Sequence, residues 1–341
     1  MIVNYHGGDL LLDCIASLQG QKVEETILVD NGSADGSAAA AAAAFPDLEV
    51  LAPGRNLGFA GGANLGARAA SGELLLFLNP DIRLPAGAVT ELAARFAESR
   101  VGVVAPPLRV EASATVEYGA TIDVIGSPVG LTTPASPVYV PGCALMTRST
   151  LFHELGGFDD RFFMFVEDVD YCWRVLLSGF DVTVPPIRPA WHFGGATAPG
   201  GYIDQQSLSS TLFRVALRER NTLAMLVKCY AGPLASIVTP VYVAQSLLTA
   251  GALAAGGRRR TARAIVAGLR WNLRERRRTL ELRRRAQASR QVRDTVVLRR
   301  MYRGLWKLRL LTRFGVPAVS EDEPDPVERD RSRRGREPTS T

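Results

Sequence analysis

Hydrophobic and polar positions follow two alternating periods through the first 200 residues. Four short apolar runs predict strands, at 2–5, 25–30, 48–51 and 73–79. Three helical patterns separate them, at 9–18, 35–44 and 63–70. This order predicts an α/β fold with a doubly wound, mostly parallel sheet and helices on both faces. In such a sheet, ligands bind at the carboxyl ends of the strands.

The pattern changes near residue 205, where long helical stretches begin. A helix is expected over 207–230, then an uncharged apolar stretch at 234–255, then Arg-rich helices over 258–313. The charged tail has few large apolar residues, which predicts disorder. We therefore expect an α/β domain at 1–204, a basic helical region at 205–315 and a disordered tail at 316–341.

Charge is distributed unevenly around the net value of +6. Segment 258–315 holds 20 Lys/Arg and 3 Asp/Glu, a net charge of +17, whereas 1–257 carries −9. Such a segment suits nucleic-acid phosphates or an anionic membrane surface. Because the uncharged apolar stretch 234–255 precedes this segment, we expect an anionic membrane surface as its partner and no binding of nucleic acid. That stretch is long enough to span a bilayer, but Pro240 and its small residues favour an interfacial or re-entrant element. Packing on the α/β domain or on a second subunit is the alternative.

Polar residues follow two of the predicted strands. Asp30 and Asn31 come after the second, where they form either an Asx turn or an acceptor for a nucleotide. Asn79 and Asp81 follow the apolar strand 73–79. A carboxylate there can hold a divalent cation that neutralises a diphosphate, although Asn-Pro-Asp is also a common turn.

The stretch FFMFVEDVDYCWRV places three carboxylates among apolar residues. Glu167, Asp170 and Arg174 lie on neighbouring helical turns, so some of these charges can pair at i,i+3 and i,i+4, whereas Asp168 points elsewhere. A carboxylate in a partly apolar setting has the raised pKa that a general base requires. His192 lies between aromatic residues, and its imidazole would suit a divalent site near Asp81.

The ends of the chain and its cysteines bear on location. No short ligand spacing joins the four cysteines and no secretory signal precedes them, which predicts reduced core residues in a cytosolic setting. A strand at residue 2 raises the expectation that the native chain starts slightly upstream of Met1.

Seven motifs occur together in order: VNYHGG, VDNGSADGS, NLGFAGGANLG, LFLNPD, PGCALMTR, GGFDDRFFMFVEDVDYCWR and WHFGG. With RERNTLAMLVK, they make residues 1–230 resemble a bacterial family 2 glycosyltransferase of the GT-A fold, closest in pattern to the rhamnosyltransferase-like subgroup. The glycine-rich motif lacks the dinucleotide and P-loop fingerprints.

The resemblance implies a role for each matching position. Asp168 would be the catalytic base, and Asp81 with His192 would bind Mg²⁺ or Mn²⁺; Asn79 replaces the first Asp of the family's metal-binding motif. Residues implied in nucleotide binding are Tyr5, Asp30, Asn31, Asn56 and Asn64. Supporting roles fall to Asn79, Glu167, Asp170, Trp173 and Arg174.

The implied function is inverting sugar transfer at the cytoplasmic face of the cell membrane. The donor would be dTDP-rhamnose and the acceptor a lipid-linked or cell-envelope glycan, with a homo-oligomer possible. The alternatives are galactofuranosyl or N-acetylhexosaminyl transfer from a UDP-sugar, or a non-catalytic nucleotide-sugar-binding membrane protein. A nucleotidyltransferase is disfavoured because HGGDLL, after the first strand, carries no Lys or Arg.

Overall fold

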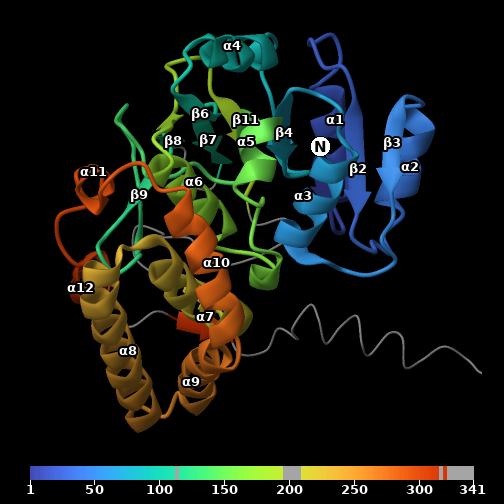
Figure 1. The fold of residues 1–341 in the computed structure, drawn as a ribbon. Coiled ribbons are helices and arrows are strands. Elements are labelled where there is room, and N and C mark those ends of the chain that lie inside the picture. The colour runs from blue at the N-terminus through green and yellow to red at the C-terminus, as the bar shows by residue number, and fades with distance from the viewer. Residues whose placement is uncertain (112–114, 195–208, 315–317, 321–341) are drawn as a thin grey trace, which may run out of the picture.

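A seven-stranded sheet forms the centre of the N-terminal part of the molecule (Figure 1). The computed structural model describes residues 1–111, 115–194, 209–314 and 318–320. In spatial order the strands are β12 (Asp181–Thr183), β6 (Val101–Val104), β11 (Ala144–Arg148), β4 (Leu74–Leu78), β1 (Ile2–Asn4), β2 (Thr26–Asp30) and β3 (Leu48–Leu51). β11 runs antiparallel to β4 and β6, and the other pairs are parallel. The predicted α/β fold with a mostly parallel sheet is confirmed.

Helices cover the sheet on both faces. They are α1 (Gly8–Ala16), α2 (Ser37–Ala44), α3 (Gly58–Ala69), α4 (Ala88–Ala94), α5 (Ser149–Glu154) and α6 (Glu167–Leu177). α3 begins five residues before its predicted start, because the glycines of its first turns permit close packing. A Cβ at Gly58 would lie 2.2 Å from the Phe163 carbonyl oxygen, and one at Gly62 would lie 2.8 Å from Val3 Cγ1. The glycine-rich motif therefore serves packing.

A smaller sheet flanks the main one. Its strands are, in spatial order, β5 (Ile82–Arg83), β13 (Ala190–His192), β7 (Leu108–Val110) and β8 (Thr115–Glu117). Beside it lies the hairpin β9 (Ala120–Ile122) and β10 (Pro128–Gly130). β5 begins directly after Asp81, and in the β5–β13 pair His192 stands opposite Ile82. The β5–β13 pairing therefore brings Asp81 and His192, which are 111 positions apart in the sequence, next to each other.

Helices dominate the C-terminal part. They are α7 (Leu212–Cys229), α8 (Gly232–Ala255), α9 (Arg259–Arg274), α10 (Arg276–Ala288), α11 (Asp294–Leu298) and α12 (Trp306–Phe314). α7 begins later than predicted, after strand β14 (Ser209–Thr211), which pairs parallel with β15 (Ala318–Ser320). The prediction of disorder was wrong for residues 318–320, where Val319 interrupts the polar composition with an apolar β-branched residue. The rest of that tail lies outside the described residues.

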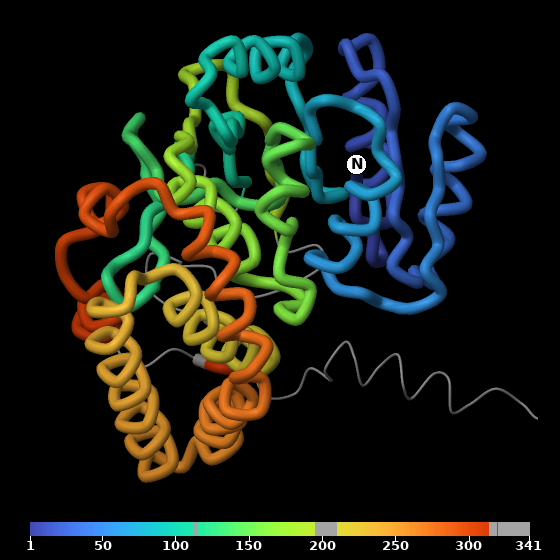
Figure 2. The backbone as a smooth tube through the Cα atoms, in the orientation of Figure 1, coloured from blue at the N-terminus to red at the C-terminus, as the bar shows by residue number. Residues whose placement is uncertain are grey.

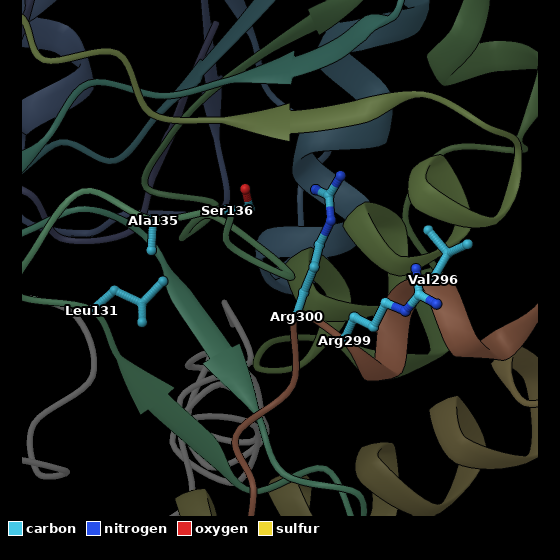
Figure 3. Close-up of a pocket in the computed structure, with 6 residues that line it drawn as sticks. All are labelled: Leu131, Ala135, Ser136, Val296, Arg299 and Arg300. Carbon is cyan, nitrogen blue, oxygen red and sulfur yellow. The ribbon is translucent and has the colours of Figure 1, made fainter.

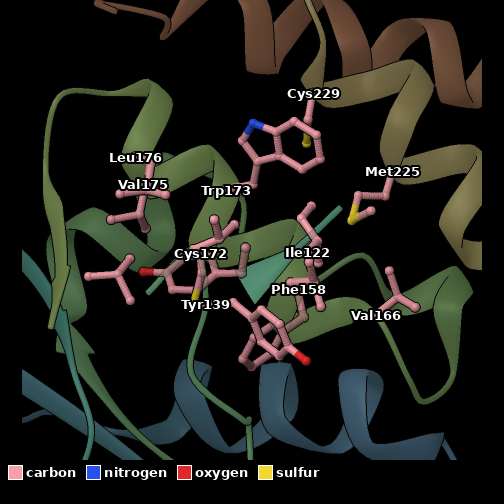
Figure 4. Close-up of a cluster of buried hydrophobic side chains, with 14 of the residues drawn as sticks. Ile122, Tyr139, Phe158, Val166, Cys172, Trp173, Val175, Leu176, Met225 and Cys229 are labelled. Atoms are coloured by element: carbon pink, nitrogen blue, oxygen red, sulfur yellow. The ribbon is translucent and has the colours of Figure 1, made fainter. Parts of the chain in front are cut away.

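α7 belongs to the same hydrophobic core as α6. Trp173 of α6 is fully buried and meets Tyr230 edge-on, with ring centroids 4.7 Å apart. Met225 and Cys229 of α7 extend toward the α6 side chains in this core (Figure 4). A domain boundary at residue 204 would cut through this core, so we place α7 with the α/β domain.

Candidate active site

Polar side chains collect where β4, β1 and β2 end side by side. Asn4, fully buried at the end of β1, donates from Nδ2 to Asp30 Oδ1 at 3.1 Å and to Ser33 Oγ at 3.0 Å. Tyr5 follows it, half-buried, with its ring edge-on to His6. Tyr5 and Asp30 therefore neighbour each other at this edge. Asn4 was missed from sequence because a buried amide at a strand end has no distinctive pattern.

Asp81 and His192 form a pair beside this edge. His192 Nε2 lies 3.6 Å from Asp81 Oδ2, and Asp81 is 3% exposed. Asp81 Oδ1 is buried and has no hydrogen-bond partner. A buried carboxylate oxygen without a partner, next to an imidazole, is chemically suited to a divalent cation. In the described part of the chain no group of three His, Cys, Asp or Glu side chains forms a potential metal cluster. Further ligands would therefore come from a bound diphosphate or water.

Asp168 stands in the first turn of α6 and faces the start of β11. Its Oδ2 accepts from the Gly142 backbone N–H at 3.0 Å and its Oδ1 from that of Val169 at 2.7 Å. Burial raises the pKa of Asp168, and these two donors and the nearby Arg218 partly offset the rise. A half-buried carboxylate with a raised pKa can accept a proton.

The Asp81 and Asp168 sites are joined through one short segment. Gly142 binds Asp168, and the next residue, Cys143, accepts from the Asn79 N–H at 2.9 Å, two residues before Asp81. Burial raises the pKa of the Cys143 thiol well above its ordinary value, and the charges of Asp81 and Asp168 raise it further. The two carboxylates thus flank Cys143.

Glu117 and Tyr139 also lie near these carboxylates and were not predicted. Burial raises the pKa of Glu117, and nearby His192 opposes the rise. Burial raises the pKa of Tyr139, and the charge of Asp168 adds to the effect. Both residues come from the weakly patterned segment between residues 111 and 140, where sequence periodicity gave no signal.

The three predicted asparagines are committed to the protein backbone. Asn31, 2% exposed, donates to the Gly58 carbonyl, and Asn64 both donates to and accepts from the backbone of Phe158. Asn56 Oδ1 accepts from the Gly58 N–H at 2.8 Å. Nucleotide binding by these asparagines stays a prediction; in the structure the amides of Asn31 and Asn64 bind backbone groups and position α3.

The supporting carboxylates differ from each other. Asp170 is fully buried and binds Arg174 at 2.9 Å and Lys228 Nζ at 2.9 Å. Lys228, 2% exposed, also lies 2.6 Å from Asp159. Glu167 does not share this network: its Oε2 is buried without a partner, and burial raises its pKa well above the ordinary value. The predicted pairing within this helix is found between Asp170 and Arg174 at i,i+4 and does not include Glu167.

The loop before α6 is held in an unusual conformation by α7. Phe163, Phe165 and Val166 all have positive φ, which L-residues with side chains rarely adopt. Asn221 Nδ2 lies 2.8–3.0 Å from three carbonyl oxygens of this loop, those of Phe162, Met164 and Phe165.

Two further contacts complete the support of this loop. Arg220 donates to the Phe162 carbonyl at 3.0 Å and to Asn221 Oδ1 at 2.9 Å. From the opposite side, the Ala60 N–H of α3 donates to the Phe163 carbonyl at 3.0 Å. Helices α3 and α7 thus both bind the loop that leads into Asp168.

A separate pocket of about 440 Å³ lies between the segment after β10 and α11 (Figure 3). Its lining residues are Leu131, Ala135, Ser136, Val296, Arg299 and Arg300. None of the predicted site residues lines it. Arg300 is paired with Asp181.

The chain is similar to known glycosyltransferases. Residues 1–157 match the family model Glycosyl transferase family 2. Over 210 residues the chain is 30% identical to the pre-mycofactocin glycosyltransferase of Mycobacterium tuberculosis, covering 54% of this chain and 43% of that protein. It is 28% identical over 253 residues to the N-acetylglucosaminyl-diphospho-decaprenol L-rhamnosyltransferase of the same organism, covering 62% and 81%.

Solved structures support the fold at low sequence identity. The structure of GalNAc-T7 with UDP, GalNAc and Mn²⁺ superposes with a TM-score of 0.53 at 14% identity, covering 67% of this chain and 47% of that one. Staphylococcus aureus TarS 1–349 gives 0.50 at 14% identity, covering 71% and 69%. The matched part of the chain spans less than half the length of the pre-mycofactocin glycosyltransferase. Residues 1–157 therefore match the glycosyl transferase family 2 model, and the fold resembles that of solved glycosyltransferase structures.

Asn221→Ala should loosen the loop at 162–168 specifically. The Met164 and Phe165 carbonyls lose this donor, whereas the Phe162 carbonyl keeps Arg220. Losing the partner of a buried polar group costs about 1–3 kcal/mol of stability. Amide hydrogen exchange should therefore accelerate across this loop. The matched control is Asn272→Ala, which removes an amide that binds Arg220 and Gly268 carbonyls but no loop atom. If the Asn221 variant folds and amide hydrogen exchange in the loop is unchanged, Asn221 does not hold the loop.

Glu167→Gln should stabilise the protein at neutral and higher pH. The folded pKa of Glu167 lies above its unfolded value, so stability falls as pH rises through the folded value. A glutamine has no proton to lose and escapes this fall, whereas below the unfolded pKa the two proteins should be similar. Urea unfolding at about pH 4, 6 and 8 measures the difference. The exposed Glu154→Gln is the control, and a Glu167 variant less stable at every pH would refute the assignment.

Proposed function

We propose that this protein transfers a sugar from a nucleoside diphosphate donor to an acceptor hydroxyl, with inversion. The observation that carries the proposal is the convergence of two carboxylates around Cys143: Asp81, with an unpartnered buried oxygen beside His192, and Asp168, held on Gly142. A donor diphosphate and an acceptor need these two environments close together. The family match of residues 1–157 supports the reaction class.

Asp168 is the general base of the proposed reaction. Its carboxylate takes the proton of the acceptor hydroxyl while that oxygen attacks the anomeric carbon from the face opposite the diphosphate. A new glycosidic C–O bond forms, the anomeric C–O bond to the phosphate breaks, and the nucleoside diphosphate leaves with the bonding electrons. The proton remains on Asp168, whose raised pKa favours its uptake.

Asp81 and His192 would hold a divalent cation, Mg²⁺ or Mn²⁺, for the donor. When bound, this ion neutralises the diphosphate and so stabilises it as a leaving group. Tyr5 and Asp30 flank the nucleoside at the ends of β1 and β2. The structure of GalNAc-T7, which contains UDP and Mn²⁺, supports this cofactor choice.

The preferred donor is dTDP-rhamnose and the preferred acceptor a lipid-linked or cell-envelope glycan. Similarity to the decaprenol-linked rhamnosyltransferase of M. tuberculosis supports this choice. A UDP-sugar donor is the alternative, in line with the structure of TarS with UDP. We also propose that the helical region up to residue 315 attaches the protein to the cytoplasmic face of the membrane. A panel of nucleotide sugars, scored by release of nucleoside diphosphate with and without Mn²⁺, tests the donor.

Asp81→Asn should weaken Mn²⁺-dependent binding of the nucleoside diphosphate by more than about tenfold, since even outer-shell changes at metal sites have that effect. The fold should survive, because Asp81 Oδ1 has no hydrogen bond to lose. Isothermal titration with UDP and dTDP, with and without Mn²⁺, measures the loss. Asp13→Asn, at an exposed pair with Arg83, should bind normally. Equal metal-dependent affinity in the Asp81 variant would exclude its role.

Asp168→Asn should lower turnover by about 10²–10⁴-fold, the usual contribution of a general base. In the parent protein, turnover should fall as pH drops through the raised pKa of Asp168, and this acidic limb should vanish in the variant. Donor affinity should change little because Asp168 acts on the acceptor. Glu167→Gln is the matched control. If it is inactive while Asp168→Asn turns over normally, the base is Glu167.

A further inference from the structure

Helix α8 presents a long apolar face to solvent. Its buried residues recur every fourth position, at Val238, Tyr242, Ser246 and Ala250. The exposed residues include large hydrophobic ones: Ile237 is 63% exposed, Val241 52%, Leu247 50% and Leu248 75%. None of the 24 residues of α8 is charged. An apolar face of this length on a folded protein marks an interaction surface.

By length and composition, α8 is the one helix among the described residues that could cross a membrane, and 22% of its apolar window is buried. The contacts on its packed side argue against crossing. Tyr242 and Ser246, near its middle, donate to Glu219 of α7, which also binds Lys307 at 2.8 Å. A crossing helix would carry this ion pair toward the hydrocarbon core, where charges are costly.

Helix α9 adds a second constraint. It packs antiparallel beside α8, and the two project together from the body of the protein (Figure 2). Exposed arginines run along its whole length, at 259, 260, 263, 270 and 274. If α8 crossed a bilayer, these arginines would enter it as well. If α8 lies flat, they can meet lipid headgroups while α8 meets the acyl boundary.

We infer that α8 lies in the plane of an anionic membrane surface, with Ile237, Val241 and Leu248 in the acyl boundary and the arginines of α9 at the headgroups. The occupant of the apolar face is a lipid surface because cations border it and segment 258–315 carries +17. A second copy of the chain would bring the same cations together and is disfavoured. This inference specifies the membrane attachment proposed above and is independent of the sugar-transfer reaction.

Vesicle flotation of the full chain tests the surface without donor or acceptor, so its result is separate from that of any transfer assay. Vesicles of equal parts phosphatidylglycerol and phosphatidylcholine should bind at least tenfold more protein than phosphatidylcholine alone, and high salt should weaken binding. The double variant Ile237→Glu with Leu248→Glu should lose at least tenfold. Val50→Glu, an exposed hydrophobic position on β3, is the matched control. Equal binding by the double variant and the control would overturn the inference.

A second variant and a depth measurement complete the test. Arg263→Gln with Arg270→Gln leaves the apolar face intact and should lower binding to anionic vesicles only. A polarity-sensitive dye on Leu248→Cys should be quenched best by shallow brominated lipids, and alkaline carbonate should release the protein. The four native cysteines are buried and should stay unlabelled. Deep quenching with resistance to carbonate would show a spanning helix. A dimer that Leu248→Glu disrupts, without vesicle binding, would show a protein interface.

Discussion

The candidate site depends on one strained loop and the groups that hold it. Backbone with positive φ at residues with side chains costs about 1–3 kcal/mol each, and this loop contains three such residues, including the β-branched Val166. Such a conformation persists only where its surroundings fix it. Here Asn221 of α7 and the Ala60 N–H of α3 bind the loop carbonyls from two sides. The position of Asp168 therefore depends on contacts with segments far away in the sequence.

A buried ion-pair network also joins α7 to the segment that carries Asp168. Asp159, Asp170 and Lys228 are each less than 10% exposed, and the lysine lies between the two carboxylates. Removing one partner of such a network leaves an uncompensated buried charge, which costs about 3–5 kcal/mol. Lys228 of α7 thus holds α6 through Asp170. The site therefore depends on α7, the first helix after the predicted domain boundary. This explains why the carboxylate-rich stretch tolerates its apolar setting. Asp170 is paired with Arg174 and Lys228, Asp168 accepts backbone hydrogen bonds, and of the three carboxylates only Glu167 has a buried oxygen without a partner.

Sequence patterns predicted the features that depend on neighbouring residues in the chain, which are the secondary structure and the residues at strand ends. Strand β3 and the order of strands and helices through β4 followed from hydrophobic period, and strand ends pointed to Asp30 and Asp81. What sequence could not supply were partners set by tertiary packing. The side-chain amide of Asn31 donates to the Gly58 carbonyl, and Arg174 pairs with Asp170 and not with Glu167. Helical spacing of four residues favoured the Asp170–Arg174 pair, but the second partner of Asp170, Lys228 on α7, could not be read from the sequence.

Helix α7 joins the two halves of the molecule because its faces contact different partners. Asn221 and Lys228 point to the loop and to α6, whereas Glu219 binds Tyr242 of α8 and Lys307 of α12. Residues of one helix therefore hold the carboxylate edge and the α8–α9 hairpin relative to each other. The proposed transfer to a lipid-linked acceptor would require a constant distance between the site and the membrane surface. A helix packed on both sides meets that need directly, whereas a flexible linker would let the distance vary.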